Sequence, residues 1–357
     1  MTKTVPVRVV EVQTDGGFDW GDAAIGAAAV VAVGAIGLGA FLARRHVLMC
    51  LVGLVLLMAA TAGSAQAKPA AGAWALAQDA ETVPGTSSDL NVAGFQDGCP
   101  IESPDGRSLY FASTRPRFPG DTRTDIDIWV AHRDSKDAPW GAPENLGEPV
   151  NSTFDDFCPT PTRGKRLFFV SRRTIPGVTC GMGDIYRTRL NPGMGWEEPE
   201  HLGCEWDGGP NTGLDEQGPS YVKTGGPVLY YSSGIPSGPT ASGDIYRSRR
   251  HGDGSFGPPE LVAELSSPSI DIQPNVRRDG REVVFASNRL GGFGGQDIWV
   301  STRKGPNDDW GTPVNLGGNV NTPAGETRPS FSWDGGTLYF GRAPGAPSTA
   351  DIYVTTR

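Results

Sequence analysis

Short apolar segments rich in aromatic residues recur along the chain, and each one follows a turn that contains glycine. Five such segments are present: Leu109–Phe111, Leu167–Phe169, Leu229–Tyr231, Val283–Phe285 and Leu338–Phe340. After each comes an Asp-Ile-Trp or Asp-Ile-Tyr tripeptide, and these begin at residues 127, 184, 244, 297 and 351. Short apolar runs bounded by such turns are typical of hairpin strands, because glycine tolerates the positive φ of a tight turn. The pattern predicts two neighbouring strands in every unit.

Two further strand-like elements flank this pair. A segment with a proline at residue 100, 159, 219, 274 or 329 comes before the turn. An aromatic residue with a proline three positions later follows the tripeptide, in Trp140–Pro143, Trp196–Pro199 and Trp310–Pro313 and more weakly in Phe256–Pro259. The last unit ends at Arg357 without this element, but Trp74 begins a similar segment near the other end.

Four strands in a unit that recurs every 53 to 60 residues are what a propeller blade requires. A single blade has two apolar faces that it cannot bury alone, so neighbouring blades must pack side by side around an axis. The sequence therefore predicts an all-β fold, a five-bladed β-propeller of four-stranded blades. The N- and C-terminal segments are expected to pair in one blade, which closes the ring and removes a free sheet edge.

Two stretches resemble the repeat of a known propeller family. Ser103–Ser113 and Ala286–Gly292, the latter continuing into Gln296–Trp299, are similar to the TolB-type (WD40-like) propeller repeat. The resemblance covers the chain from residue 74 to 357 and implies a periplasmic or surface module for binding and scaffolding. The extra N-terminal domain of TolB itself is missing, so its partnership with a peptidoglycan-binding lipoprotein is not carried over.

The first part of the chain is predicted to be a hydrophobic leader. Residues 1–46 form a short segment in which residues 23–42 are apolar and long enough to cross a bilayer as a transmembrane helix. Residues 47–67 follow the basic pair Arg44-Arg45 and resemble a secretory signal peptide, with a short apolar run and small residues at its end. The propeller domain is then 68–357. It is expected to be exported to the cell envelope or the extracellular space, with membrane contact only through the N-terminal segment.

Composition and charge narrow the classes of function. The 357-residue chain contains 50 Gly and 30 Pro, which suits many short strands joined by turns. Its formal net charge is -9, and the sequence contains no basic stripe. Nucleic-acid binding is not expected, because phosphate contacts need clustered Lys and Arg.

An acidic residue stands three positions before the proline in every unit. The five are Asp97, Asp156, Glu216, Asp271 and Glu326. Because the innermost strand of a blade lines the central channel, these side chains are expected to form a carboxylate ring around one channel mouth. Such a ring would suit Ca²⁺ or a polar ligand. The alternative is structural, with each carboxylate accepting backbone hydrogen bonds at the start of the inner strand.

Positions that differ between units are better candidates for ligand specificity. Gln273 and Arg328 stand directly before the inner-strand proline, and Glu102 and Tyr221 stand two residues after it. We expect these four side chains to contact a ligand in the central channel. Arg328 has two interpretations, since it could pair with the acidic ring or hold an anionic group of a substrate.

Four cysteines remain after the leader, which permits two disulfides in an oxidising compartment and three connectivities. Cys99 and Cys158 hold equivalent positions in neighbouring units, so a bond between them would join two blades. Cys180 and Cys204 belong to one unit and could form a bond within it. A zinc site is the competing interpretation, although paired Cys-x-x-Cys spacing is missing.

Together, these features favour an exported, non-catalytic binding or scaffold propeller with its ligand at the mouth of the central channel. The expected partner is a protein or a cell-wall saccharide or peptide. No cofactor is expected other than Ca²⁺ at the carboxylate ring, and the chain is expected to be a monomer. The alternative is a carbohydrate-active hydrolase, a glycosidase that uses channel carboxylates. A serine hydrolase does not fit, because no Gly-x-Ser-x-Gly motif occurs.

Overall fold

A computed structural model describes residues 73–235, 241–343 and 350–357. The expected leader segments, 1–46 with its apolar stretch and 47–67, lie outside the described residues. Within the described part of the chain, no helix is both long and apolar enough to cross a membrane.

In each unit the described residues form four kinds of strand, which follow one another in the same order along the chain. The proline-containing strands are β2 (Asp97–Glu102), β6 (Asp156–Thr162), β11 (Asp215–Val222), β15 (Asp271–Val276) and β19 (Gly325–Phe331). The aromatic-rich strands are β3 (Ser108–Ser113), β7 (Arg166–Ser171), β12 (Val228–Gly234), β16 (Glu282–Ser287) and β20 (Thr337–Ala343). The strands that begin with Asp-Ile are β4 (Asp127–His132), β8 (Asp184–Asn191), β13 (Asp244–Arg249), β17 (Asp297–Thr302) and β21 (Asp351–Thr356).

The outer strands are only two residues long. They are β1 (Gln78–Asp79), β5 (Glu144–Asn145), β10 (Glu200–His201), β14 (Glu260–Leu261) and β18 (Val314–Asn315), with a further short strand, β9 (Gly195–Trp196). Four of them start directly after the proline of the aromatic-x-x-Pro element, since proline itself cannot donate to a sheet ladder. Two 3₁₀ turns, η1 (Ala80–Thr82) and η2 (Glu205–Asp207), complete the described elements.

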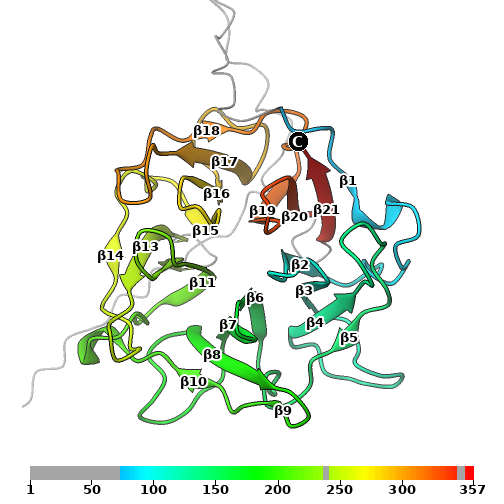
Figure 1. The fold of residues 1–357 in the computed structure, drawn as a ribbon, viewed down its shortest axis with the longest axis horizontal. Coiled ribbons are helices and arrows are strands. Elements are labelled where there is room, and N and C mark those ends of the chain that lie inside the picture. Colours follow the sequence, from blue (N-terminus) through cyan, green and yellow to red (C-terminus); the bar gives the residue numbers. More distant parts are fainter. Residues whose placement is uncertain (1–72, 236–240, 344–349) are drawn as a thin grey trace, which may run out of the picture. The chain divides into compact units, whose positions relative to one another are not determined.

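These strands form five antiparallel blades around a central axis, which confirms the predicted fold (Figure 1). Blades 1 to 4 follow chain order from the inside outward: β2-β3-β4-β5, then β6-β7-β8-β10 with β9 beside β8, then β11-β12-β13-β14, then β15-β16-β17-β18. Blade 5 has the order β19-β20-β21-β1. Its outer strand therefore comes from the other end of the domain, with Gln78 opposite Val354 and Asp79 opposite Tyr353. The predicted closure is confirmed.

The apolar core lies in the gaps between blades. Phe111, Phe169, Tyr231, Phe285 and Phe340, the last aromatic residues of the five aromatic segments, are each 0 % exposed. One cluster joins Phe111 and Trp129 of blade 1 to Tyr339 and Ile352 of blade 5. Burying one such side chain stabilises the fold by roughly 1.5–3 kcal/mol, so blade-to-blade packing explains why aromatic residues recur in the repeat.

Every inner strand carries a β-bulge just before its proline. The pairing register with the second strand shifts there in all five blades. The residues before the prolines have φ between 49° and 57°: Cys99, Cys158, Gly218, Gln273 and Arg328. A bulge changes the direction of the side chains beside it. Here these five positions line a small pocket of about 30 Å³ between the inner strands, which we call the waist.

Candidate active site

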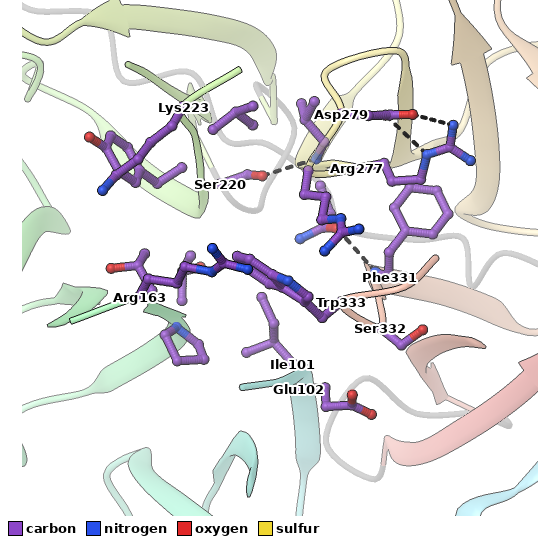
Figure 2. Close-up of a pocket in the computed structure, with 18 of the residues that line it drawn as sticks. Ile101, Glu102, Arg163, Ser220, Lys223, Arg277, Asp279, Phe331, Ser332 and Trp333 are labelled. Atoms are coloured by element: carbon purple, nitrogen blue, oxygen red, sulfur yellow. Dashed lines mark hydrogen bonds and ion pairs between the residues drawn. The ribbon is translucent and has the colours of Figure 1, made fainter. Parts of the chain in front are cut away.

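The inner strands all run in the same direction, so their last residues gather at one end of the axis. There, the strand ends and the turns that follow them enclose a cavity of about 420 Å³, to which every blade contributes (Figure 2). We call it the axial cavity. The pocket at the waist is much smaller, at about 30 Å³. The axial cavity has a volume that is usual for ligand sites.

Cationic and aromatic side chains share the lining of the axial cavity. Trp333 lies in the middle of the view in Figure 2, with Arg163 beside it. The Cζ atoms of Arg163 and Arg278 lie 5.2 and 5.9 Å from the centroid of the Trp333 ring, within the range of cation–π attraction. Lys223 and Tyr221 complete this side of the cavity. The predicted contact Tyr221 is therefore placed in the lining.

Glu102, the second predicted contact beyond the prolines, also lines the axial cavity. It is 7 % exposed, and burial raises the pKa of its carboxyl although Arg133 opposes the shift. Oε2 accepts a hydrogen bond from Arg133 at 3.0 Å and one from the Tyr339 hydroxyl at 3.5 Å. Oε1 has no hydrogen-bond partner among the described residues, so it is the oxygen that can carry a proton.

Asp279 is the other carboxylate in the lining, and it stands in the turn of blade 4. Burial acts to raise its pKa, but hydrogen bonds from the Arg277 guanidinium and the Arg281 backbone N–H prevail and lower the pKa below its ordinary value. The distance from Arg277 Nη2 to Asp279 Oδ2 is 2.6 Å. Asp279 is therefore already ionised at the pH at which Glu102 begins to lose its proton.

The five ring carboxylates lie at the opposite end of the inner strands and are turned into the blades. All five are 0 % exposed. Four pair with an arginine of the same blade: Asp97 with Arg115, Asp156 with Arg173, Asp271 with Arg289 and Glu326 with Arg342. Their predicted role as ligand contacts at an open channel mouth is wrong, because burial and the guanidinium groups remove them from the channel. The structural alternative describes them better, and Ca²⁺ would have to displace an arginine in each of these four blades.

Arg173 illustrates how these arginines hold a blade together. It donates to Asp156 at 2.9 Å, to the Val150 carbonyl at 2.6 Å and to the Ser171 hydroxyl at 2.7 Å. Its guanidinium also stacks on the rings of Phe169 and Tyr186. One side chain thus ties the inner strand, the second strand and the preceding loop together.

Gln273 and Arg328 lie at the waist rather than in the axial cavity. Arg328 forms no salt bridge among those of the described residues, so its predicted pairing with the acidic ring is wrong. Burial lowers its pKa to about 10, helped by Arg172 nearby. Gly98 makes room for it, since a Cβ at that position would lie 2.8 Å from Arg328 Nη1. Its other interpretation, as a partner for an anionic group, stays a prediction.

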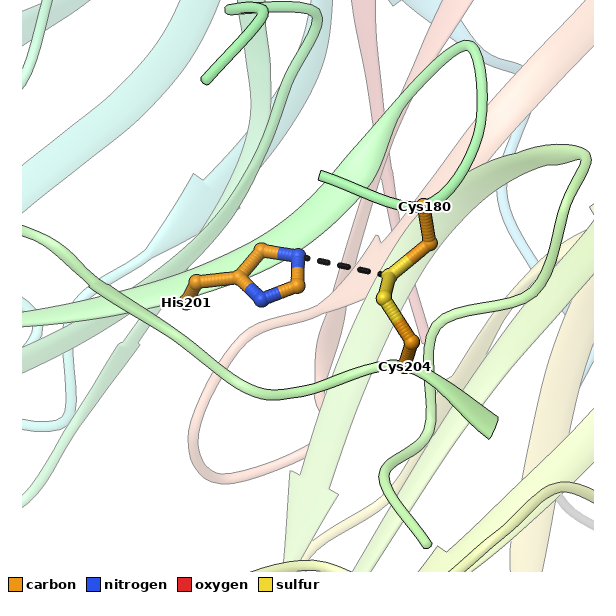
Figure 3. A group of neighbouring side chains, drawn as sticks. All are labelled: Cys180, His201 and Cys204. Carbon is orange, nitrogen blue, oxygen red and sulfur yellow. Dashed lines mark hydrogen bonds between the residues drawn. A yellow bond between two sulfur atoms is a disulfide. The ribbon is translucent and has the colours of Figure 1, made fainter. Parts of the chain in front are cut away.

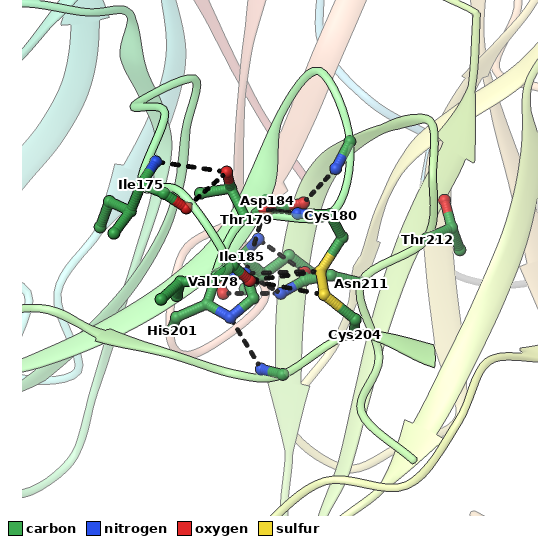
Figure 4. Close-up of a disulfide and its surroundings, with 12 residues drawn as sticks. Ile175, Val178, Thr179, Cys180, Asp184, Ile185, His201, Cys204, Asn211 and Thr212 are labelled. Carbon is green, nitrogen blue, oxygen red and sulfur yellow. Dashed lines mark hydrogen bonds and ion pairs between the residues drawn. A yellow bond between two sulfur atoms is a disulfide. The ribbon is translucent and has the colours of Figure 1, made fainter. Parts of the chain in front are cut away.

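Both disulfides suggested by the sequence are present. Cys99–Cys158 joins blades 1 and 2 at the waist, and Cys180–Cys204 closes a loop of blade 2. His201 lies beside the second bond, with Nε2 at 3.7 Å from Cys180 Sγ and 3.0 Å from Asp184 Oδ2 (Figures 3 and 4). The three side chains have the composition of a metal site, but the two sulfurs are bonded to each other, which rules out the four-cysteine zinc interpretation.

Several residues of the axial cavity were not singled out from the sequence: Arg163, Lys223, Arg278, Asp279 and Trp333. All stand between the end of an inner strand and the turn that follows it. When the units are aligned on the inner-strand proline, Arg163, Lys223, Arg278 and Trp333 all stand four residues after it, and Asp279 stands five residues after it. That alignment is the signal that would have found them.

No family model and no curated protein sequence matches the chain. Among solved structures, a thermostable family-43 glycoside hydrolase matches with a TM-score of 0.50 and 14 % identity, over 76 % of this chain and 91 % of that one. An α-L-arabinofuranosidase from Lactobacillus brevis matches with a TM-score of 0.47 and 16 % identity, over 76 % and 94 %. An endo-arabinase from Bacteroides thetaiotaomicron VPI-5482 matches with a TM-score of 0.46 and 17 % identity, over 76 % and 98 %. At 14 % identity, the first of these matches supports a shared fold and nothing more.

These matches correct three expectations. The chain's structural neighbours are family-43 glycoside hydrolases, so the TolB-type resemblance is wrong as a family assignment. The prediction of a non-catalytic binding or scaffold module, and with it the expectation that the protein is more likely no enzyme, is not supported, because a similar solved structure is a glycoside hydrolase. Of the expected partners, a saccharide stays a prediction, and membrane attachment and a monomeric state are not supported. The two disulfides are consistent with the expected extracellular setting.

Proposed function

We propose that the protein is a carbohydrate-active hydrolase whose active site is the axial cavity. The observation that carries this proposal is the pair of carboxyl groups in the cavity lining, of which Glu102 has a raised pKa and Asp279 a lowered one. Two acids whose environments separate their pKa values are the usual basis for acid–base catalysis. The propeller fold shared with a family-43 glycoside hydrolase supports the same class of reaction.

In this proposal Glu102 is the proton donor and Asp279 the base. The glycosidic C–O bond breaks as Glu102 gives its proton to the leaving oxygen. Water attacks the anomeric carbon and passes its proton to Asp279. The two residues come from blades 1 and 4, which are not neighbours, and they lie on different sides of the cavity (Figure 2). We therefore propose an inverting reaction, in which the attacking water lies between the two carboxyl groups.

The test is release of reducing ends from a panel of soluble polysaccharides. The Glu102→Gln variant should lower kcat by roughly 10²–10⁴-fold, the usual contribution of a general acid, and Asp279→Asn should act similarly. Glu198→Gln is the matched control, because Glu198 is exposed and has no hydrogen bond or salt bridge among those of the described residues. A wild-type protein that cleaves none of the substrates, or a Glu102→Gln variant with unchanged kcat, contradicts the proposal.

The dependence of the rate on pH separates the two roles. Activity should fall at high pH as Glu102 loses its proton, at a pH above the ordinary glutamate pKa because burial raises that pKa. Activity should fall at low pH as Asp279 gains a proton, below the ordinary aspartate pKa. Asp279→Asn should abolish the acidic limb in whatever activity remains. If activity falls neither above the ordinary glutamate pKa nor below the ordinary aspartate pKa, the roles of Glu102 as acid and Asp279 as base are both contradicted.

A further inference from the structure

The axial cavity continues into a second cavity of about 360 Å³ between blades 2 and 3. The two cavities share part of their lining, namely Thr162, Arg163, Tyr221 and Lys223. We call the second cavity together with this shared lining the basic track. It runs outward from the axis at the same end of the propeller as Glu102.

The basic track is lined by cations without matching anions. Its cations are Arg163, Arg166, Arg187, Lys223 and Arg250, and its lining includes no carboxylate. Among the salt bridges of the described residues, only Arg187 of these five has an acidic partner, Glu200 at 2.6 Å. In the axial cavity, Glu102 and Asp279 are already paired with Arg133 and Arg277. The shared lining therefore carries an excess of positive charge.

The pKa of Tyr221 is independent evidence that these cations lie close together. Burial raises the pKa of Tyr221, and Arg250, Arg166 and Arg187 all act to lower it. Three guanidinium groups thus lie close enough to one phenol to affect it. Holding like charges together is unfavourable, and it is unexpected in a chain with a net charge of -9. An anionic ligand is the partner that would offset this repulsion.

We propose that the basic track binds an acidic polysaccharide, with its carboxylate or sulfate groups on the track and the bond to be cleaved in the axial cavity. This inference rests on the proposed hydrolase function and adds the substrate class to it. Arginine is suited to the role because its planar guanidinium can hold a carboxylate or sulfate group through two parallel hydrogen bonds. The tyrosine in the shared lining offers an apolar face for a sugar ring.

The test compares two probes that differ only in charge: an oligogalacturonate and the same oligomer as its full methyl ester. Binding to the intact protein is measured by calorimetry, with wild type and with the Glu102→Gln variant to prevent turnover. The acidic oligomer should bind at least about 10-fold more tightly in low salt, and this preference should shrink as salt screens the charges. A sulfated oligosaccharide serves as a third probe. Comparing its affinity with that of the oligogalacturonate shows whether the track prefers sulfate or carboxylate groups.

Variants on the track should remove the preference. Replacing Arg166 and Arg250, which line the second cavity but not the axial cavity, together by Gln should weaken binding of the acidic oligomer by roughly 3- to 20-fold, since each exposed ion pair contributes modestly. Binding of the ester should not change. The matched control is the Arg281→Gln and Lys304→Gln double variant, whose two cations lie outside both cavities and form no salt bridge among those of the described residues.

The outcomes separate this inference from the proposed function. Equal affinity for acid and ester, with hydrolysis of a neutral polysaccharide intact, overturns the inference and leaves the hydrolase. Tight binding of the acidic oligomer without cleavage of any substrate keeps the basic track and overturns the hydrolase. Tighter binding of a single-stranded DNA oligomer of the same charge than of either saccharide also overturns the inference.

Discussion

Glu216 is the ring carboxylate without an arginine. In blade 3, Ile235 stands where blades 1, 2 and 4 have Arg115, Arg173 and Arg289. Glu216 Oε1 accepts hydrogen bonds from the hydroxyls of Thr212 and Ser233, while Oε2 is buried without a partner among the described residues. Burial raises the pKa of Glu216 to about 7, against the smaller opposing effect of those hydrogen bonds.

This single group should make stability depend on pH. Because the pKa is higher in the folded than in the unfolded state, the folded state holds the proton longer. Stability therefore falls as pH rises from about 4.5 to about 7, by about 3 kcal/mol. The Glu216→Gln variant mimics the protonated form and should melt at a higher temperature than wild type above pH 7, but at nearly the same temperature at pH 4.5. Thermal melts across this range measure the difference.

The control for this prediction is Glu198→Gln, which removes a fully solvated charge. It should leave the pH dependence of the melting temperature as in wild type. If Glu216→Gln is destabilised equally at all pH values, the carboxyl is ionised in the folded protein and the account of blade 3 is wrong.

At the scale of single residues, the sequence showed which positions matter better than it showed what their side chains do. The acidic position of every unit was found, but sequence spacing cannot show that the side chain turns into the blade toward an arginine. The axial-cavity residues Glu102 and Tyr221 were singled out because their positions vary between units. Trp333 and Asp279 were missed because they lie in turns, beyond the inner-strand positions that were expected to line the channel.

At the scale of strands and blades, the arginine of each ring pair fastens three segments. Arg289 pairs with the buried Asp271 and also donates to the Leu265 carbonyl at 2.7 Å and the Ser287 hydroxyl at 3.0 Å. Its side chain is 15 % exposed and that of Asp271 is 0 % exposed. The pair is thus largely removed from water, and each charge depends on the other.

Arg289→Met should therefore destabilise the protein by about 3–5 kcal/mol, because it leaves the Asp271 carboxylate buried and unpaired. Adding Asp271→Asn should recover part of that loss, since no buried charge then remains. Chemical denaturation measures both effects. Arg281→Met is the control, because Arg281 is exposed and its side chain has no hydrogen bond or salt bridge among those of the described residues. A loss no larger than in this control would show that the pair does not hold the blade.

The strand pattern was predictable because aromatic residues and turn glycines recur with the blade. The bulges of the inner strands were not. Gln273 and Arg328 adopt positive φ although neither is a glycine, and their conformation is imposed by the geometry of the waist. Four outer strands were located to within a few residues, because a proline marks where each of them begins.

At the scale of the whole molecule, ring closure followed from counting elements, since one outer strand was missing at one end and available at the other. The positions of the charged side chains in the folded molecule could not be predicted by counting. The sequence has no basic stripe, yet the fold brings Arg163 and Arg166 of blade 2 next to Lys223 and Arg250 of blade 3. Residues on different blades come together only in the closed ring, so composition alone gave the net charge but not this cluster of cations.

The two ends of the axis thus differ in a way that bears on function. One end holds five buried carboxyl groups, four of them paired with arginine. The other end holds the axial cavity, with accessible cations, a tryptophan and two carboxyl groups whose pKa values are shifted in opposite directions. The account therefore places saccharide binding at the second end alone.

A crystal structure of the Glu102→Gln variant soaked with an oligogalacturonate tests this placement most directly. The account predicts a sugar ring in the axial cavity, with a carboxylate within about 3 Å of the Arg163 guanidinium or the Lys223 ammonium. Sugar bound only at the opposite end of the axis, beside Asp97 and the other ring carboxylates, would contradict it.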